Sequence, residues 1–404
     1  MSIRSLLIAA AAGLGLGIPV AHAQTGTPLT IGVLTDTSGV FTDVSGRGSI
    51  TAAEMAIEDF GGTVLGRPIR LISADHQNKP DVGAGIARKW FDEDGVTAIF
   101  DLPTSAVALA VQHLAHEKNK ITVISSASTD IATNAQCSPT GAHWTYDSYS
   151  VGKVLAEALA KPGSKWFFAV VDNVGGATLQ NSATPFLEAA GAKIVGAVRH
   201  PQNTADMSSF ILGAQTSGAD FVAMGNAGVD LITFVKQWRE FGLSGKDQTL
   251  VGIVLFLTDL GAIGLQDGQG LTYVTGFTSE ASPEAAEWSK RFIERHGKGP
   301  NDSQAGVYSA VSHYLKAVKD AGTTDTAAVM PKMRELPVED MFTKHGVLRP
   351  DGRMMHDMYL VKAKAPSESK GPWDLVSLVK TIPAKDAFRP LEKSGCPLVR
   401  KQAN

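Results

Sequence analysis

Cysteine is scarce in this sequence. Only Cys137 and Cys396 occur among 404 residues, which is too few for a zinc site built from cysteine alone and excludes a small disulfide-rich scaffold. The two residues can form one disulfide between the middle of the chain and its end, or they can stay separate thiols, and the sequence leaves both open. Export from the cytoplasm would favour the bond.

Net charge is also nearly absent. The formal charge is −3, from 37 Lys and Arg residues against 40 Asp and Glu residues. Proteins that bind nucleic acid present a basic surface to the phosphates, so no nucleic-acid partner is expected. The composition, 44% hydrophobic and 19% charged, is typical of a globular chain with a large core, and the length favours two domains.

Long apolar runs are missing except at the N-terminus. Arg4 precedes an apolar and small-residue run over 6–20, and Ala21-His22-Ala23 follows. This pattern predicts a signal peptide over 1–23 that is cleaved after Ala23, although an uncleaved anchor is the alternative. The run is short for a membrane span, which needs about 20 residues. We therefore expect an exported protein, most simply in a periplasm.

The motifs of common enzymes are missing too. There is no G-x-S-x-G and no Walker A sequence. The segment Gly46-Arg47-Gly48 begins like a dinucleotide fingerprint, but Thr51 replaces its third glycine. It also follows the preceding strand by about eleven residues, where the fingerprint needs a tight turn. An exported Rossmann-type oxidoreductase is therefore the weaker alternative.

One cluster of residues is superficially similar to a metal site. His113, His116 and Glu117 read H-x-x-H-E, whereas the zinc-protease motif reads H-E-x-x-H. Helical spacing predicts that both histidines face solvent. We expect no enzymatic activity, no metal and no cofactor.

The sequence does contain a regular alternation of β-rich runs and amphipathic segments. Strands are expected at 29–34, 68–74, 96–100, 121–124, 165–172, 192–198 and 219–224. Helices are expected at 46–60, 104–118, 176–190, 205–217 and 228–241, and around Val82, Ile86 and Trp90. This alternation predicts an α/β fold with two doubly wound parallel sheets of about four strands each. The last third departs from the rhythm, with helices at 285–295 and 305–321 and strands at 354–362 and 373–379.

The two halves share a weak internal sequence repeat. Asp75-His76-Gln77-Asn78 precedes one expected helix, and His200-Pro201-Gln202-Asn203 precedes another. Helix capping alone places Asn and Asp at such positions, so the repeat is only suggestive of two related halves.

Several short segments carry a family resemblance through their order and spacing. They are 31–39 (IGVLTDTSG), 66–69 (GRPI), 74–75 (AD), 101–106 (DLPTSA), 123–129 (VISSAST) and 237–242 (QWREFG). With these segments the mature chain resembles the leucine/isoleucine/valine-binding family, the type I periplasmic solute-binding proteins of ABC transporters. The resemblance implies two lobes joined by a three-segment hinge near 143–150, 274–282 and 342–353.

The resemblance also implies domain bounds. The first lobe would comprise 28–146 plus 279–344, the second would comprise 147–278 plus 345–382, and a tail would follow over 383–404. If the two cysteines pair, this tail has to return to the first lobe.

Ligands of such folds bind at the carboxyl ends of strands, where helix N-termini favour anions. The resemblance implies that small residues of the first lobe, Thr104, Ser105, Ala127 and Ser128, bind a ligand carboxylate. The full set of predicted ligand-binding residues is Ser38, Phe41, Thr104, Ser105, Ala127, Ser128, Tyr146, Asn173, Gly176, Asn226 and Phe256.

The chain departs from the amino-acid binders of this family at two places. The loop 173–177 has no aromatic residue, and no acidic residue stands near Val254 to receive a ligand ammonium. A buried ammonium without a carboxylate is costly. Phe41, Tyr146 and Phe256 would instead line a flat slot for an aromatic or other organic acid. Asp147 and Asp259 keep an amino acid open as the alternative.

The expected function is that of a periplasmic substrate-binding component of an ABC importer. It would capture a small carboxylate by lobe closure and deliver it to a permease in the inner membrane. We expect a monomer. A ligand-sensing periplasmic receptor without a transport role is the alternative.

Overall fold

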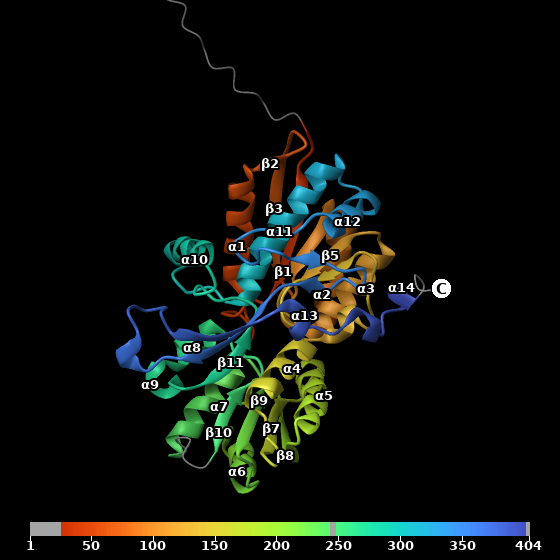
Figure 1. Ribbon diagram of the computed structural model, residues 1–404. Coiled ribbons are helices and arrows are strands. Elements are labelled where there is room, and N and C mark those ends of the chain that lie inside the picture. Colours follow the sequence, from red (N-terminus) through yellow and green to blue (C-terminus); the bar gives the residue numbers. More distant parts are fainter. Residues whose placement is uncertain (1–25, 243–247, 401–404) are drawn as a thin grey trace, which may run out of the picture.

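The computed structural model describes residues 26–242 and 248–400 (Figure 1). The predicted signal peptide and its cleavage site lie outside these residues. Figure 1 shows two lobes, one above the other, joined by several passages of the chain. No helix in the described part of the chain is long and apolar enough to cross a membrane.

The first lobe is built on a six-stranded sheet in the order β2-β3-β1-β4-β5-β6. Its strands are β1 (Leu29–Thr35), β2 (Thr63–Val64), β3 (Arg67–Asp75), β4 (Val96–Asp101), β5 (Ile121–Ile124) and β6 (Gly141–His143). Only β2 pairs antiparallel. Every residue of β1 is buried, as expected for a central parallel strand that is covered on both faces.

Helices cover both faces of this sheet. They are α1 (Gly46–Phe60), α2 (Pro80–Asp92), α3 (Ser105–Glu117), α10 (Pro283–His296), α11 (Asp302–Ala321) and α12 (Thr326–Glu335). α1 and α11 share one apolar cluster, and α2 and α3 share another. A Cβ on Gly48 would lie 2.1 Å from Nε2 of Gln304 on α11. Gly48 therefore allows close helix packing, and Gly46 supplies a positive φ of 46° at the start of α1. These two roles explain the segment without a dinucleotide.

The second lobe is built on a seven-stranded sheet in the order β15-β14-β11-β10-β9-β7-β8. Its strands are β7 (Lys165–Val171), β8 (Lys193–His200), β9 (Phe221–Gly225), β10 (Thr249–Gly252), β11 (Thr272–Thr275), β14 (Met358–Ala363) and β15 (Val376–Ile382). Its helices are α4 (Ser148–Leu159), α5 (Val174–Ala189), α6 (Ser208–Thr216), α7 (Val229–Glu240), α8 (Leu257–Ile263) and α9 (Leu265–Gly268).

The predicted α/β class with two doubly wound lobes is confirmed, but the predicted count of about four strands per sheet is too low. β6, β10 and β11 have only three or four residues and were not predicted. The expected strand 354–362 is divided into β13 (Met354–Met355), which pairs with β12 (Val347–Leu348), and β14. The residue-level domain bounds stay a prediction.

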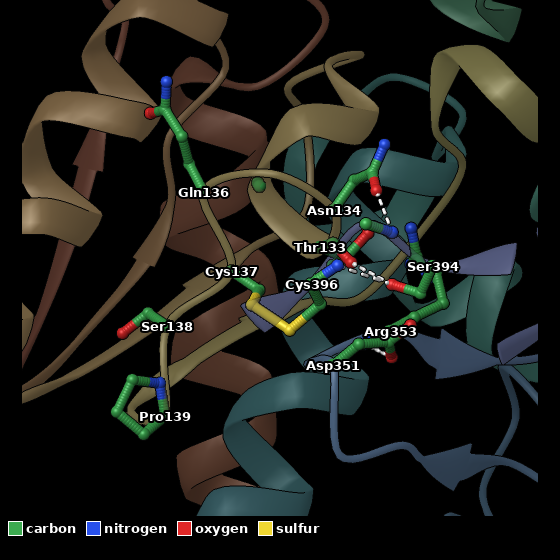
Figure 2. The surroundings of a disulfide bond; sticks show 12 residues. Thr133, Asn134, Gln136, Cys137, Ser138, Pro139, Asp351, Arg353, Ser394 and Cys396 are labelled. Carbon is green, nitrogen blue, oxygen red and sulfur yellow. Dashed lines mark hydrogen bonds between the residues drawn. A yellow bond between two sulfur atoms is a disulfide. The ribbon is translucent and has the colours of Figure 1, made fainter. Parts of the chain in front are cut away.

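The C-terminal tail crosses back from the second lobe to the first. After β15 it forms α13 (Ala384–Ala387), η3 (Leu391–Lys393) and α14 (Pro397–Arg400). A disulfide joins Cys396 to Cys137 of the first lobe, and the N–H of Gly395 donates to Oδ1 of Asn134 (Figure 2). The tail is thus a further connection between the lobes, beside the three expected crossings.

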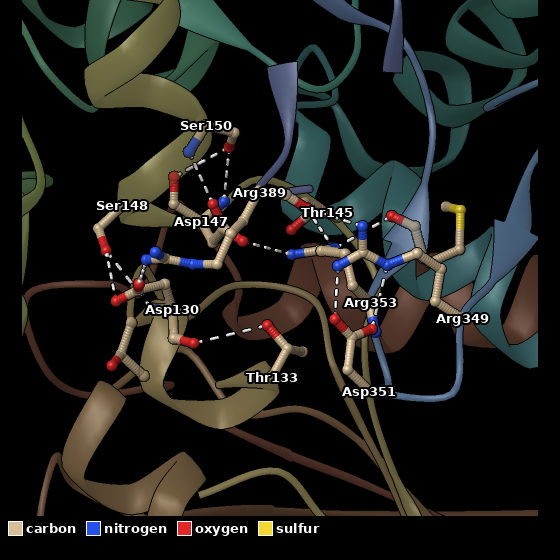
Figure 3. Close-up of polar contacts among 12 residues, drawn as sticks. Asp130, Thr133, Thr145, Asp147, Ser148, Ser150, Arg349, Asp351, Arg353 and Arg389 are labelled. Atoms are coloured by element: carbon tan, nitrogen blue, oxygen red, sulfur yellow. Dashed lines mark hydrogen bonds and ion pairs between the residues drawn. The ribbon is translucent and has the colours of Figure 1, made fainter. Parts of the chain in front are cut away.

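A buried charged cluster lies where the first and third crossings run side by side (Figure 3). The N–H of His143 donates to the carbonyl of Gly352 over 2.8 Å. The Arg353 guanidinium pairs with Asp147, with 3.3 Å between Nη1 and Oδ2, and also donates to the carbonyl of Thr145. Burial lowers the pKa of Arg353 to about 10.

Arg389 of the tail contacts both lobes in the same region. Its Nη2 lies 2.5 Å from Oδ2 of Asp130, in the 3-10 turn η1 (Asp130–Thr133) of the first lobe. Its guanidinium stacks 4.3 Å from the ring centre of Tyr149 on α4. Charge pairing and cation–π contact therefore fasten the tail across the hinge.

Candidate functional site

A cavity of about 150 Å³ lies between the lobes, at the carboxyl ends of both sheets. The loops after β1, β3, β4, β5 and β6 line it from the first lobe, and those after β7, β8, β9 and β10 from the second. Parallel strands bring their carboxyl ends to one edge, which explains how residues distant in sequence meet there.

Nine of the eleven predicted ligand-binding residues line this cavity: Phe41, Thr104, Ser105, Ser128, Tyr146, Asn173, Gly176, Asn226 and Phe256. Their role in binding stays a prediction, since position alone does not test it. Ser38 and Ala127 do not line the cavity. The exposed Ser38 hydroxyl donates to Oδ2 of Asp75, and Ala127 packs in the core beneath α3.

The first-lobe side of the cavity carries hydroxyl groups and a helix N-terminus. Thr104 precedes α3 without capping it by its side chain, and its hydroxyl donates to Oδ1 of Asn78. Asn78 in turn donates to Oδ2 of Asp36 over 2.9 Å. The first-turn N–H groups of α3 therefore have no acceptor in their own helix, an arrangement that favours an anion.

The turn before Thr104 has an unusual backbone. Asp101 and Leu102 have φ values of 85° and 61°, which is strained for residues with side chains. The Ser126 hydroxyl donates to Oδ1 of Asp101 and so ties the β5 loop to the end of β4. Burial raises the pKa of Asp101 to about 6. The strained turn and this tie aim the loops that carry Thr104, Ser105 and Ser128 at the cavity.

Aromatic rings form the apolar part of the cavity. The Tyr146 hydroxyl donates to the carbonyl of Ser126 over 2.6 Å, which fixes the ring. The Tyr146 and Phe256 rings meet edge to face, with 5.8 Å between their centres. Phe41 is half-buried, and Oδ2 of Asp36 accepts its N–H over 3.0 Å. These three rings line the cavity. The flat slot for an aromatic ligand stays a prediction.

The second-lobe side contributes amide side chains. Asn173 caps α5 by accepting the N–H of Gly176 over 3.0 Å. Asn226 and Gln202 line the cavity from the loops after β9 and β8. Among the residues described, no Asp, Glu, Lys, Arg or His lines the cavity, so a ligand charge would be met by dipoles and hydroxyl groups.

The two acids that kept an amino-acid ligand open lie outside the cavity lining. Asp147 caps α4 and pairs with Arg353. Asp259 lies in the first turn of α8, and its Oδ2 accepts the N–H of Phe256 over 3.2 Å. Burial raises the pKa of Asp259 to about 7.

The lobes touch across the mouth of the cavity. A Cβ on Gly228 of the second lobe would lie 2.1 Å from the carbonyl oxygen of Val40 in the first. A Cβ on Gly175 would lie 3.4 Å and 3.5 Å from the hydroxyl oxygens of Ser128 and Ser105. The structure is therefore a closed form of the two lobes.

Several lining residues were not among the predicted ones. Asn78 and Gln202 lie in the two segments of the internal sequence repeat, 75–78 and 200–203. The two segments therefore line opposite sides of the cavity. Ser126, Gly175 and Val254 belong to the same loops as the predicted residues Ser128, Gly176 and Phe256. Which residue of a loop faces inward depends on its backbone turn, which sequence alone does not give.

The chain matches a known protein family over residues 28–372, the family described as periplasmic binding protein. The chain belongs to the periplasmic binding protein family. This confirms the predicted resemblance, and it is a family of substrate-binding proteins rather than enzymes. His113 and His116 are exposed on α3, as the helical spacing predicted. No group of three or more potential metal ligands occurs within the described ranges.

Solved structures of similar proteins support the same assignment. A periplasmic binding protein from Burkholderia mallei is 38% identical, with a TM-score of 0.87, covering 92% of this chain and 99% of its own. A branched chain amino acid ABC transporter periplasmic ligand-binding protein from Burkholderia xenovorans is 42% identical, with a TM-score of 0.83, covering 92% of this chain and 100% of its own.

A more distant structure shares the fold alone. The solute-binding protein of an ABC transporter from R. palustris, solved in complex with benzoate, is 19% identical with a TM-score of 0.80, covering 92% of this chain and 100% of its own.

Proposed function

We propose that this protein is the periplasmic substrate-binding component of an ABC importer and that its ligand is a small aromatic carboxylate. The observation that carries the ligand class is the lining of the closed cavity, which combines three aromatic rings with uncharged polar groups. The family membership supports the transport role.

The carboxylate would bind on the first-lobe side. The N-terminus of α3 and the hydroxyl groups of Ser105 and Ser128 lie there. Backbone N–H groups and the helix dipole stabilise an anion without a cationic side chain. The ring would then lie against Phe41, Tyr146 and Phe256.

The size and charge of the cavity favour an aromatic acid over an amino acid. A dry cavity of about 150 Å³ accommodates one benzene ring in another protein, and the volume here is also about 150 Å³. An α-ammonium would find no carboxylate in the described lining, and leaving it unpaired would be costly. The benzoate complex of a protein with the same fold supports this class of ligand.

Closure would couple binding to transport. A ligand on one lobe gains contacts to the other lobe only in the closed form, so it shifts the population toward closure. A permease in the inner membrane would then recognise the closed protein as a monomer. A receptor that senses the same acid would close in the same way. Uptake of the acid by cells with and without the protein separates the two roles.

The ligand class can be tested with residues 24–404, stripped of ligand by unfolding and refolding. Thermal unfolding would be followed with benzoate, hydroxybenzoates, short dicarboxylates, leucine and glucose. A ligand at about 100 times its Kd stabilises the folded protein by about 2.7 kcal/mol. We expect this rise with the benzoates only. A rise with leucine and none with benzoates would overturn the proposal.

Matched variants locate the carboxylate. Ser105→Ala and Ser128→Ala remove hydroxyl groups that line the cavity, whereas Ser38→Ala removes one outside it. The first two should weaken benzoate binding and the third should not. Equal effects of all three would contradict the proposed position of the carboxylate.

A further inference from the structure

A buried hydrogen-bond relay ends at the cavity. The Nδ1 of His200 lies 2.9 Å from the carbonyl oxygen of Pro201. A carbonyl only accepts, so Nδ1 carries the proton of the neutral ring and Nε2 is an acceptor. Nε2 lies 2.9 Å from Nδ2 of Asn226, so the Asn226 amide nitrogen is the donor.

This relay fixes the orientation of the Asn226 amide. If the amide were reversed, its oxygen would face the lone pair of Nε2, and two acceptors would meet. Asn226 is 2% exposed, and its Oδ1 has no hydrogen-bond partner within the described residues. Because His200 does not line the cavity and Asn226 does, Oδ1 is the polar atom left to meet a ligand.

We propose that Asn226 is a specificity-determining residue that selects aromatic acids carrying a hydroxyl on the edge of the ring that faces the second lobe. A buried acceptor without a donor destabilises the bound state, so a ligand that supplies a donor is favoured. This inference rests on the proposed function and extends it from aromatic acids to hydroxylated ones.

The ligand group that donates to Oδ1 of Asn226 should be neutral. An ammonium would also donate to Oδ1, but no charged side chain of the described residues lines the cavity to balance it. A phenolic hydroxyl brings the hydrogen without the charge. Because the carboxylate is expected at the first lobe and Asn226 lies on the second, the hydroxyl belongs at position 3 or 4 of the ring.

The test is calorimetric titration of residues 24–404 with benzoate, 3-hydroxybenzoate, 4-hydroxybenzoate and 4-methoxybenzoate. One hydroxy isomer should bind at least about tenfold more tightly than benzoate, because only it satisfies the buried acceptor. The methoxy acid has no donor and should bind no better than benzoate.

Variants assign the preference to the relay. Asn226→Leu keeps the size of the side chain and should bring the hydroxy acid to the affinity of benzoate. Asn181→Leu, at an exposed position of α5, is the matched control and should leave the preference unchanged. His200→Phe frees the amide to turn, so it should reduce the ratio of hydroxy to methoxy affinity.

Failure takes two distinguishable forms. If the benzoates bind with equal affinity, or if Asn226→Leu keeps the preference, the inference is overturned and the proposed function stands. If no aromatic acid binds, the proposed function and the inference are both overturned.

Discussion

Asp147 and Arg353 form an ion pair at the hinge, although both side chains are almost fully buried. Asp147 begins the first helix of the second lobe, and Arg353 lies on the third crossing. The pair therefore joins two passages of the chain that are far apart in the sequence.

Removal of one partner should strongly destabilise the protein. Asp147→Ala leaves the buried Arg353 charge without its partner and should lower the free energy of unfolding by about 3–5 kcal/mol. Urea unfolding measures this change in the free energy of unfolding. The double variant Asp147→Ala with Arg353→Met should lose less than Asp147→Ala and Arg353→Met together, because neither charge remains buried. Strict additivity would contradict a coupled pair.

The pair also predicts a pH dependence at the acidic end. Burial opposes the charge of Asp147, but Arg353, His143 and the N–H of Ser150 outweigh it, so its pKa lies below 3.8 in the folded protein. The stabilisation is complete above the unfolded pKa and is lost as pH falls through the folded value. The stability difference between the wild type and Asp147→Asn should be constant from about pH 5 to 8 and shrink below about pH 4.

The contribution of Asp259 to stability should change with pH in the opposite direction to that of Asp147. Burial raises its folded pKa from 3.8 to about 7, so the folded protein binds a proton that the unfolded chain releases within this window. Its contribution to stability therefore falls as pH rises from about 4 to 7. Asp259→Asn should be more stable than the wild type at pH 8, by about 2–4 kcal/mol, and no more stable at pH 4.

Urea unfolding at pH 4, 6 and 8 tests this prediction for Asp259. Asp81→Asn, at an exposed position of α2, is the control and should shift stability by less than about 1 kcal/mol at each pH. Parallel pH profiles of the wild type and Asp259→Asn would show that Asp259 does not titrate in this range.

The disulfide should contribute measurably to stability. It joins residues 259 positions apart, and such a bond restricts the unfolded chain. Replacement of both cysteines by serine should cost about 2–5 kcal/mol and lower the Tm. Dithiothreitol should lower the Tm of the wild type toward that of the double variant and leave the double variant unchanged. A wild-type Tm that does not change on full reduction would contradict a stabilising role of the disulfide.

Gly228 should be required for closure rather than for folding. A Cβ there would clash with the carbonyl of Val40 only when the lobes meet, and its φ is 60°. Gly218 has a φ of 68° and open space around it. Gly218→Ala should lose about 1 kcal/mol of stability for its positive φ. Gly228→Ala should lose about 1–3 kcal/mol, because its ψ of −138° combined with the positive φ is nearly restricted to glycine.

Ligand affinity separates these two glycine variants. Gly228→Ala should bind the ligand at least about tenfold more weakly, because the closed form is strained and therefore less populated. Gly218→Ala should bind as the wild type does. Small-angle scattering should show that saturating ligand compacts Gly218→Ala but not Gly228→Ala. Full compaction of both variants would contradict this role for Gly228.

Long periodic segments made much of the fold predictable. The helix 46–60 and the strand 121–124 have the bounds expected from the sequence, because Gly61 ends the helix and turn residues flank the strand. Strands such as β6 (GAH) and β10 (TLVG) were missed. They are about as short as the strand 121–124 (ITVI) but lack its unbroken run of β-branched residues.

The candidate site was predictable at the level of loops rather than of side chains. Strand ends indicated the edge of both sheets at which the cavity lies, and nine predicted residues line it. Ser38 and Ala127 belong to loops at this edge but do not line the cavity. Binding by any of these residues stays a prediction. The pairs Asp147 with Arg353 and His200 with Asn226 were not foreseen, because they depend on contacts between distant segments.

The bond between Cys137 and Cys396 makes the intervening chain a closed covalent ring. This ring contains every strand of the second sheet, from Lys165 to Ile382. A protease that cuts one exposed turn within the ring opens it without releasing a fragment. The nicked protein would migrate as an intact chain on a non-reducing gel and separate into two pieces only after reduction.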